Sequence, residues 1–193
     1  MKRIYRFLAI GLVLVVLGAG YFFTNLTIFD RTFIQLKTSQ KVSYIPFENK
    51  LNMQCDKADN SVSKLASSHF RLVNWNVHKG QDTGWQEDLA RLSGQADFVL
   101  LQEATQYQNL NTFSTALFVS SFSFKDLLSG VKTFTKTQPE WYCGGGVAEP
   151  LIQIPKVASV MSFPLEKGDS LLLINVHLIN FEMYPTAYEE QLR

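Results

Sequence analysis

Three polar side chains stand in stretches of the sequence that are otherwise apolar. Asn76 follows LVNW, Glu103 follows VLLQ, and His177 lies within LLLINVHLI. A carboxylate and an amide carbonyl are hard oxygen donors of the kind that hold Mg²⁺, which completes its shell with water and substrate phosphate. A histidine beside them can donate a hydrogen bond to a phosphate oxygen or transfer a proton. Together these residue types would suit metal-assisted chemistry on a phosphate ester.

Each of the three residues also has a simpler structural explanation. Asn76 can cap the end of a strand, Glu103 can open an exposed loop, and His177 can be a hydrogen-bonded core histidine. Asn175 and His177 are two residues apart and therefore share one face of their strand. The same spacing holds for Asn74 and Asn76. The pattern predicts a polar pocket without identifying its ligand. A transition-metal site of His69, His78 and His177 is a further interpretation, but its spacing matches no ligand motif.

Strands that end near one another must position these side chains. HFRLVNWNV and ADFVLLQE are runs of strand length, and the second is continuously apolar up to Glu103. Between them, the sequence predicts a helix that is capped by Asp82 or Thr83 and ends at Gly94. In α/β sheets, ligands commonly bind beyond the carboxyl ends of the strands. The polar residues stand at or near such ends.

The later part of the chain predicts further strands. TFSTALFVSSF is compatible with a helix or an irregular segment, SGVKTFTKTQ alternates as a strand does, and PEWYCGGG indicates a turn or loop. KVASVMSFPL and SLLLINVHLI are joined by a short loop that contains Gly168, which predicts a β-hairpin over residues 157–179. Thr186 and Glu189 form a capping-box pattern, so a helix is expected to start at about residue 187.

The N-terminus has the pattern of a membrane segment. Lys2, Arg3 and Arg6 precede residues 7–23, which carry no charge. Seventeen residues at about 1.5 Å each span roughly 25 Å, close to the thickness of a bilayer core. The basic flank favours a cytoplasmic N-terminus and export of the rest of the chain. An uncleaved anchor is the favoured interpretation, and a signal peptide cut near residues 18–20 is the alternative.

The composition is that of a globular protein whose net charge favours neither strongly acidic nor strongly basic partners. Of 193 residues, 46% are hydrophobic and 18% charged, which argues against disorder, and the net charge is +1. Strong nucleic-acid binders usually carry a marked basic excess, which is missing here, although a bound metal ion can supply local positive charge. Cys55 and Cys143 fit one disulfide of an exported domain and fit two separate thiols about as well.

Domain boundaries follow from changes in composition along the chain. We expect a membrane segment over residues 1–23, a connector over 24–68, where the sequence is mixed and then polar, and a globular domain over 69–193.

The order of the motifs carries a family resemblance. FRLVNWNVHKG, DFVLLQEATQ, SGVKTFTK, AEPLIQIPK and LLLINVHLINF follow one another across residues 69–193. This order closely resembles the endonuclease/exonuclease/phosphatase superfamily, which includes deoxyribonucleases, abasic-site endonucleases, sphingomyelinases and inositol polyphosphate phosphatases, and within it an uncharacterised bacterial branch. The resemblance implies an α/β (α+β) fold, a four-layer α/β/β/α sandwich with two mixed sheets. The chain would hold its N-terminal portion, after a transmembrane helix.

The same resemblance implies roles for individual residues. Glu103 would be the main ligand of Mg²⁺ or Mn²⁺, and Asn76 would organise that metal site and so take part in catalysis. His177 would contact the scissile phosphate, while Asn175 and Lys156 would bind substrate. The other candidate phosphate contacts, Lys79, Lys132 and Lys136, are expected to be solvated surface lysines.

Two motifs of the family do not occur in this sequence. Its members carry a GDFN-like and an SDH-like segment after the NxHL strand, and neither follows His177. The chain by itself is therefore expected to be inactive.

Two functions are consistent with these observations. The first is a metal-dependent phosphoesterase, a nuclease-like phosphodiesterase anchored in the bacterial inner membrane through residues 7–23, with its domain on the periplasmic side. Its substrate would be nucleic acid or another phosphodiester. The second is a degenerate, non-catalytic domain for binding or scaffolding at the membrane. No protein partner is predicted.

Overall fold

The computed structural model describes residues 2–45, 51–58, 62–66, 69–151, 153–179, 183 and 185–191. Helix α1 spans Lys2–Asn25, α2 spans Trp85–Ser93, α3 spans Pro185–Gln191, and a 3₁₀ turn spans His78–Gly80. The strands are β1 Leu26–Lys37, β2 Val42–Tyr44, β3 Gln54–Lys57, β4 Leu72–Asn76, β5 Phe98–Thr105, β6 Thr115–Phe124, β7 Leu127–Thr135, β8 Trp141–Ala148, β9 Pro155–Pro164 and β10 Ser170–Val176.

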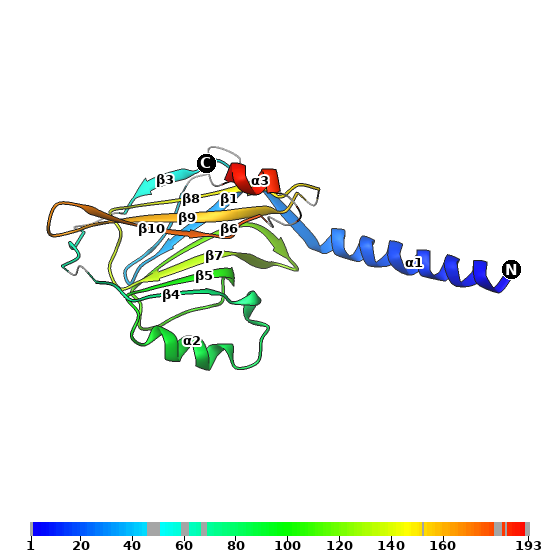
Figure 1. The fold of residues 1–193 in the computed structure, drawn as a ribbon, viewed down its shortest axis with the longest axis horizontal. Helices are drawn as coiled ribbons and strands as arrows, with labels where there is room; N and C mark the ends of the chain where they lie inside the picture. Colours follow the sequence, from blue (N-terminus) through cyan, green and yellow to red (C-terminus); the bar gives the residue numbers. More distant parts are fainter. Residues whose placement is uncertain are drawn as a thin grey trace.

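The strands form two sheets that pack against each other (Figure 1). The six-stranded sheet has the order β2-β1-β6-β7-β5-β4 and is mixed, because β4 and β5 are parallel. The four-stranded sheet has the order β10-β9-β8-β3 and is antiparallel. Buried side chains of both sheets, such as Ile34, Leu117, Met161 and Phe163, form the core between them. A second core lies between the six-stranded sheet and α2. The expected combination of helices with two sheets is therefore present, but only the six-stranded sheet is mixed, whereas the expectation was that both sheets would be.

Much of the described part of residues 24–68 belongs to the folded domain, and the expectation of a connector is wrong there. It supplies β1, β2 and β3, and β1 pairs along most of its length with β6. The buried residues Ile34 and Leu36 alternate with more exposed neighbours in FIQLK, which is the pattern of a strand. This alternation is short and follows a polar stretch, so the sequence of the segment mixes polar and apolar residues and does not clearly predict a strand. Residues 46–50, 59–61 and 67–68 lie outside the described part.

Two segments that sequence patterns left as non-strand are also strands. TFSTALFVSSF holds β6, which is buried along almost its whole length and so lacks a clear period-two pattern. PEWYCGGG holds the start of β8, whose glycines let neighbouring chains approach closely. A Cβ added to Gly144 would lie 2.8 Å from the Ile34 side chain, and one added to Gly145 would lie 2.8 Å from the Met53 Cα.

The remaining expectations agree with the structure except in one helix cap. The hairpin of β9 and β10 lies within residues 155–176, and α3 begins at Pro185, close to the expected start. Helix α2 ends before Gly94 as expected. Its N-cap, however, is Gly84 in a left-handed conformation with φ of 81°, rather than Asp82 or Thr83.

Export or membrane attachment is indicated by two features. The most apolar 18-residue window of the segment Arg3–Asn25 in α1 has a mean hydropathy of 2.3, and none of that window is buried. Helix α1 is therefore long and apolar enough to cross a membrane, a property shared by signal sequences. Cys55 and Cys143 lie directly opposite each other on β3 and β8 and form a disulfide. Disulfides persist mainly in exported proteins.

Removal of this disulfide should destabilise the domain. The cross-link joins residues that are 88 positions apart, so the double variant Cys55→Ala/Cys143→Ala should lose about 2–4 kcal/mol of unfolding free energy. Denaturant unfolding monitored by Trp fluorescence measures the loss. Reductant should lower the midpoint of the wild type and leave that of the double variant unchanged. Equal midpoints for wild type and double variant under oxidising conditions would contradict the prediction.

Candidate functional site

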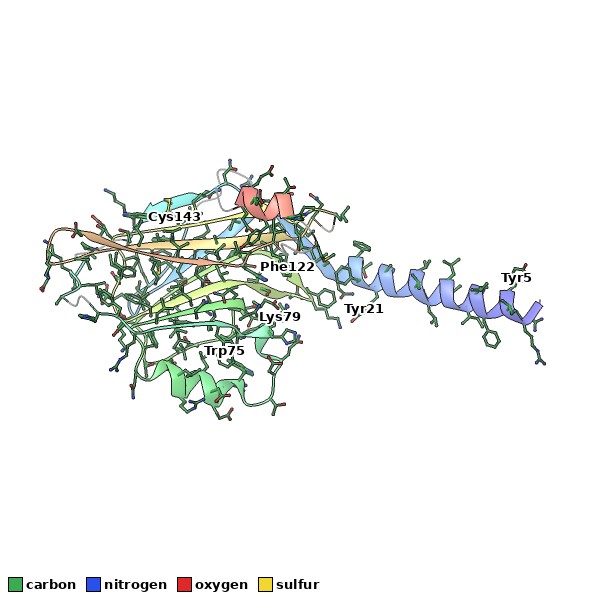
Figure 2. All side chains as sticks on the ribbon, in the orientation of Figure 1. Tyr5, Tyr21, Trp75, Lys79, Phe122 and Cys143 are labelled. Atoms are coloured by element: carbon green, nitrogen blue, oxygen red, sulfur yellow. A yellow bond between two sulfur atoms is a disulfide. The ribbon has the colours of Figure 1, made fainter. Side chains whose placement is uncertain are left out.

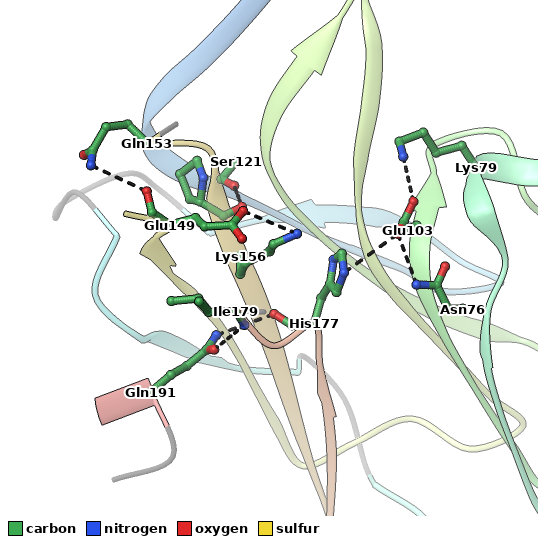
Figure 3. Close-up of polar contacts among 11 residues, drawn as sticks. Asn76, Lys79, Glu103, Ser121, Glu149, Gln153, Lys156, His177, Ile179 and Gln191 are labelled. Atoms are coloured by element: carbon green, nitrogen blue, oxygen red, sulfur yellow. Dashed lines mark hydrogen bonds and ion pairs between the residues drawn. The ribbon is translucent and has the colours of Figure 1, made fainter. Parts of the chain in front are cut away.

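Charged and ionisable side chains from both sheets converge in one cavity of about 390 Å³. Glu103 comes from β5 and His177 follows β10, while Lys156 lies on β9. Glu149 follows β8, and Lys79 reaches in from the 3₁₀ turn. Figure 3 shows the His177 ring between Glu103 and Lys156. The sheets thus bring together Glu103, His177 and Lys156, which sequence reasoning selected from distant segments.

Glu103 points into the cavity because β5 is bulged. Pairing between β5 and β7 shifts register between Leu101 and Ala104, and Glu103 itself has a φ of 49°. A bulge re-aims a side chain and locally disrupts the ladder. A left-handed non-glycine residue costs roughly 1–3 kcal/mol and persists only where its surroundings over-determine it, which happens most often at functional sites.

The carboxylate of Glu103 is held by two neighbouring side chains. Lys79 Nζ donates to Oε2 at 2.6 Å, and Asn76 Nδ2 donates to Oε1 at 3.1 Å. Partial burial alone would raise the pKa of Glu103, but the hydrogen bonds from Lys79 and Asn76 and the charge of Lys79 together outweigh it and lower the pKa to about 2. Glu103 is therefore ionised at neutral pH.

His177 lies beside this carboxylate as a neutral imidazole. Its Nε2 is 3.9 Å from Glu103 Oε1. Burial lowers the pKa of His177 to about 4, with help from the charge of Lys156 and against the opposing effect of Glu103. Lys156 Nζ in turn lies 3.6 Å from Glu149 Oε2. A neutral imidazole can donate one hydrogen bond from one ring nitrogen and accept one at the other.

Asn76 both caps its strand and contacts the site. Its Oδ1 accepts a hydrogen bond from the backbone N–H of His78 at 3.1 Å, which forms an Asx-type turn. His78 and Lys79 follow with φ of 46° and 56°. This turn brings the Lys79 side chain to Glu103. Asn76 therefore caps the end of its strand and also contacts the candidate site.

Asn175 lies outside the cavity and connects the two sheets, and its expected role in substrate binding has no support in its position. It is only 1% exposed, and its Nδ2 donates to the backbone carbonyls of Leu101 and Lys132 and to Thr133 Oγ1 at 3.1–3.3 Å. Gln102 Nε2 donates to Asn175 Oδ1 and to Asn74 Oδ1, each at 2.7 Å. This network holds the strand before His177 against the strand that carries Glu103.

Loss of the Asn175 amide should therefore destabilise the domain. Asn175→Leu keeps the side-chain volume but leaves the Gln102 amide and several buried acceptors without their partner, so the unfolding free energy should fall by about 1–3 kcal/mol. Asn111→Leu, at an exposed loop position, is the matched control and should change it by less than about 0.5 kcal/mol. Thermal or denaturant unfolding compares them. An equally small effect of both substitutions would count against the network.

Two lysines differ from the expectation of solvated side chains. Lys79 lines the cavity, and Lys132 is buried with its Nζ donating to the backbone carbonyls of Thr105, Gln106 and Gln108. Burial lowers the pKa of Lys132 to about 8. Lys136 is exposed, as expected.

Sequence reasoning also missed Glu149 as a residue of the cavity. Its position within AEPLIQIPK, seven residues before Lys156, was a signal that it could share that site.

Glu103 is a residue that could act as a ligand of Mg²⁺ in this cavity, whereas the described residues form no transition-metal site. Across the described ranges, no group of three or more His, Cys, Asp and Glu residues is placed to hold a metal ion, so the site of His69, His78 and His177 is not formed. Mg²⁺ needs only one or two carboxylates when water and substrate phosphate complete its shell. Glu103, ionised and facing the cavity, meets that requirement.

Curated bacterial proteins are similar to this chain. A UPF0294 protein of Yersinia pseudotuberculosis is 35% identical over 128 residues, which is 64% of this chain and 49% of the relative. UPF0294 proteins of Photorhabdus laumondii and Vibrio vulnificus are 32% and 28% identical over 131 and 145 residues, or 65% and 72% of this chain and 50% and 51% of the relatives. The chain is thus homologous to UPF0294 proteins and spans about half the length of the curated relatives it matches. No protein-family profile and no solved structure matches it.

Proposed function

We propose that this protein is a membrane-anchored, divalent-metal-dependent phosphoesterase with its reactive centre at Glu103. One observation carries the proposal. The carboxylate of Glu103, ionised and re-aimed by a bulge, faces a cavity beside a neutral His177 and the cationic Lys156. These groups suit a phosphate ester, which brings negative charge and hydrogen-bond acceptors to a cation and to donors.

The order of the sequence motifs supports the same proposal. It resembles the endonuclease/exonuclease/phosphatase superfamily, whose four-layer α/β/β/α sandwich is the fold we propose for the whole domain. The basic flank of α1 and the disulfide support an inner-membrane anchor with the domain on the periplasmic side. Nucleic acids and other phosphodiesters are the substrate classes compatible with the resemblance.

Each residue has a chemical role in the proposed mechanism. Glu103 would hold Mg²⁺ or Mn²⁺, which when bound supplies Lewis-acid polarisation of the phosphate and offsets charge on the leaving oxygen. Asn76 fixes the orientation of the carboxylate through its 3.1 Å hydrogen bond. His177 donates a hydrogen bond to a phosphoryl oxygen as charge develops on it. Lys156 attracts and orients the phosphate.

A non-catalytic binding or scaffold domain is the second candidate. The observation that favours it is the Lys79–Glu103 ion pair at 2.6 Å, which by itself ties the turn after β4 to β5 as a structural contact would. In that case the carboxylate would serve stability alone.

Hydrolysis assays distinguish the two candidates. The protein expressed from its complete reading frame is tested on bis(p-nitrophenyl) phosphate and on an oligonucleotide, with Mg²⁺, with Mn²⁺ and with EDTA. The phosphoesterase predicts hydrolysis of at least one substrate that EDTA abolishes and added metal restores. The scaffold predicts no hydrolysis under any of these conditions.

A further inference from the structure

The cavity around Glu103 has an apolar wall as well as a charged side. Six residues form this wall, Phe22, Leu26, Phe122, Phe124, Leu127 and Ile154. We infer that the cavity takes a membrane lipid, with its phosphate ester at Glu103, Lys156 and His177 and its hydrocarbon chain along the apolar wall. The inference rests on the proposed phosphoesterase function and specifies its substrate class.

The apolar wall is continuous with the membrane helix. Phe22 belongs to α1, and its ring centroid is 5.7 Å from that of Phe124 at the end of β6. Leu26 is the first residue of β1 and directly follows the last residue of α1. Helix α1 projects from one end of the domain (Figure 1), and Tyr21, Phe122 and Lys79 lie toward that same end (Figure 2). If α1 spans the bilayer, this end of the cavity therefore lies at the membrane surface.

Polar contacts fix the domain against the end of α1. The backbone N–H of Lys125 donates to the Asn25 carbonyl at 3.0 Å, and Lys125 Nζ lies 5.0 Å from the centre of the Tyr21 ring. Tyrosine is characteristic of membrane–water interfaces, and lysines near helix ends extend to them. The β6–β7 turn is thereby held at headgroup level, with the cavity behind it.

Exposed apolar side chains close in sequence to the charged lining residues, or lining the cavity, have the same explanation. Leu151 is 85% exposed in the loop between the lining residues Glu149 and Lys156, and the lining residue Phe22 is 42% exposed. Exposed apolar groups are unfavourable in water and, where they gather, are typical of membrane or ligand contact. A volume of about 390 Å³ is within the range of small-molecule sites and fits a headgroup with the adjoining part of a chain.

Nucleic acid explains these features less well. Its bases can stack on phenylalanine rings but have no hydrocarbon chain to cover the aliphatic Leu26, Leu127 and Ile154, and the net charge of +1 shows no basic excess. A lipid phosphate satisfies the charged and the apolar side of the cavity at once.

Adjacent phenylalanines allow a matched test. Phe22 lines the cavity, whereas Phe23 is exposed and does not, so Phe22→Ser and Phe23→Ser change α1 equally in composition. Each full-length variant is reconstituted in vesicles of phosphatidylethanolamine and phosphatidylglycerol, and headgroup release is compared with hydrolysis of bis(p-nitrophenyl) phosphate. Phe22→Ser should lower the ratio of lipid to soluble activity roughly tenfold, as loss of much of one aromatic contact predicts. Phe23→Ser should leave that ratio unchanged.

A binding measurement in EDTA is independent of catalysis. Vesicles containing a phospholipid with a diazirine on its acyl chain are irradiated, and labelled peptides are identified by mass spectrometry. Labelling of residues 122–130 that Phe22→Ser reduces and Phe23→Ser does not is the expected result. Labelling confined to α1 would overturn the inference.

The activity outcomes separate the two proposals. Hydrolysis of the soluble diester or the oligonucleotide without release of lipid headgroups would overturn the lipid assignment and leave the phosphoesterase intact. No metal-dependent hydrolysis of any substrate, lipid included, would overturn both.

Discussion

Glu103→Gln should lower metal-dependent hydrolysis by at least about a hundredfold, the size expected when one preorganised electrostatic contact at a reacting phosphate is lost. The substitution keeps the shape of the side chain but removes the charge that Asn76 and Lys79 now stabilise. A neutral amide binds a divalent cation far more weakly than a carboxylate does. Steady-state kinetics on bis(p-nitrophenyl) phosphate with saturating Mg²⁺ measures the effect.

Two controls separate chemistry from stability in this comparison. Glu87→Gln, on the exposed surface of α2, should leave activity and melting unchanged. Lys79→Met removes the same ion pair as Glu103→Gln but keeps the carboxylate, so it should retain metal dependence. If Glu103→Gln kept full metal-dependent activity, the role assigned to this residue would be wrong. If it melted early and lost activity only in proportion to unfolding, Glu103 would support the stability of the domain rather than the reaction.

Among substitutions that add a single methyl group to the domain, Gly130→Ala should lower its stability most. Gly130 lies on β7, where an added Cβ would overlap the carbonyl oxygen of Val119 and lie 2.8 Å from its carbon and 2.9 Å from the Ser120 Cα. Those atoms are backbone of the paired strand β6, next to a register shift between Ser120 and Phe122, so no side chain can move aside. We expect a loss of about 3 kcal/mol or more, and a Tm lower by roughly 6–12 °C.

Gly94→Ala is the matched control for this substitution. Its Cβ would meet nothing closer than the Ala90 carbonyl oxygen at 3.5 Å, at the exposed end of α2, so its stability should change by less than about 0.5 kcal/mol. Circular dichroism melts of the three proteins make the comparison. Equal melting temperatures for Gly130→Ala and wild type would show that β6 and β7 are farther apart than described.

Parts of the fold with strong local patterns were predictable from sequence. The continuous apolar run that ends in Glu103 is β5, and the two runs on either side of Gly168 are the β9–β10 hairpin. Strands β1, β2 and β3 were not recognised, because their segment has a mixed and then polar sequence. Strands β6 and β8 were not recognised, because β6 is buried nearly throughout and the glycines of β8 are required by contacts with residues distant in the chain. Close approaches between segments that are distant in the chain leave no pattern in a short stretch of sequence.

The candidate site was predictable where polar residues interrupt apolar strands. Asn76, Glu103 and His177 stood out in this way, and the structure places them next to one another. Lys79 was expected to be a solvated surface lysine, because the left-handed turn that brings it to Glu103 leaves no pattern in the sequence.

The roles of two residues that neighbour the site residues, Asn74 and Asn175, could not be predicted from sequence. Both belong to the hydrogen-bond network centred on Gln102, which forms only because separate strands pair in the fold.

Direct measurement of cation binding tests the central claim most closely. Mn²⁺ is titrated into the protein from its complete reading frame, without substrate, and bound ion is followed by electron paramagnetic resonance. The proposed phosphoesterase predicts one site whose affinity falls at least about tenfold in Glu103→Gln and is unchanged in Glu87→Gln, as expected when a ligating carboxylate is lost. Equal Mn²⁺ affinity in wild type and Glu103→Gln would contradict it.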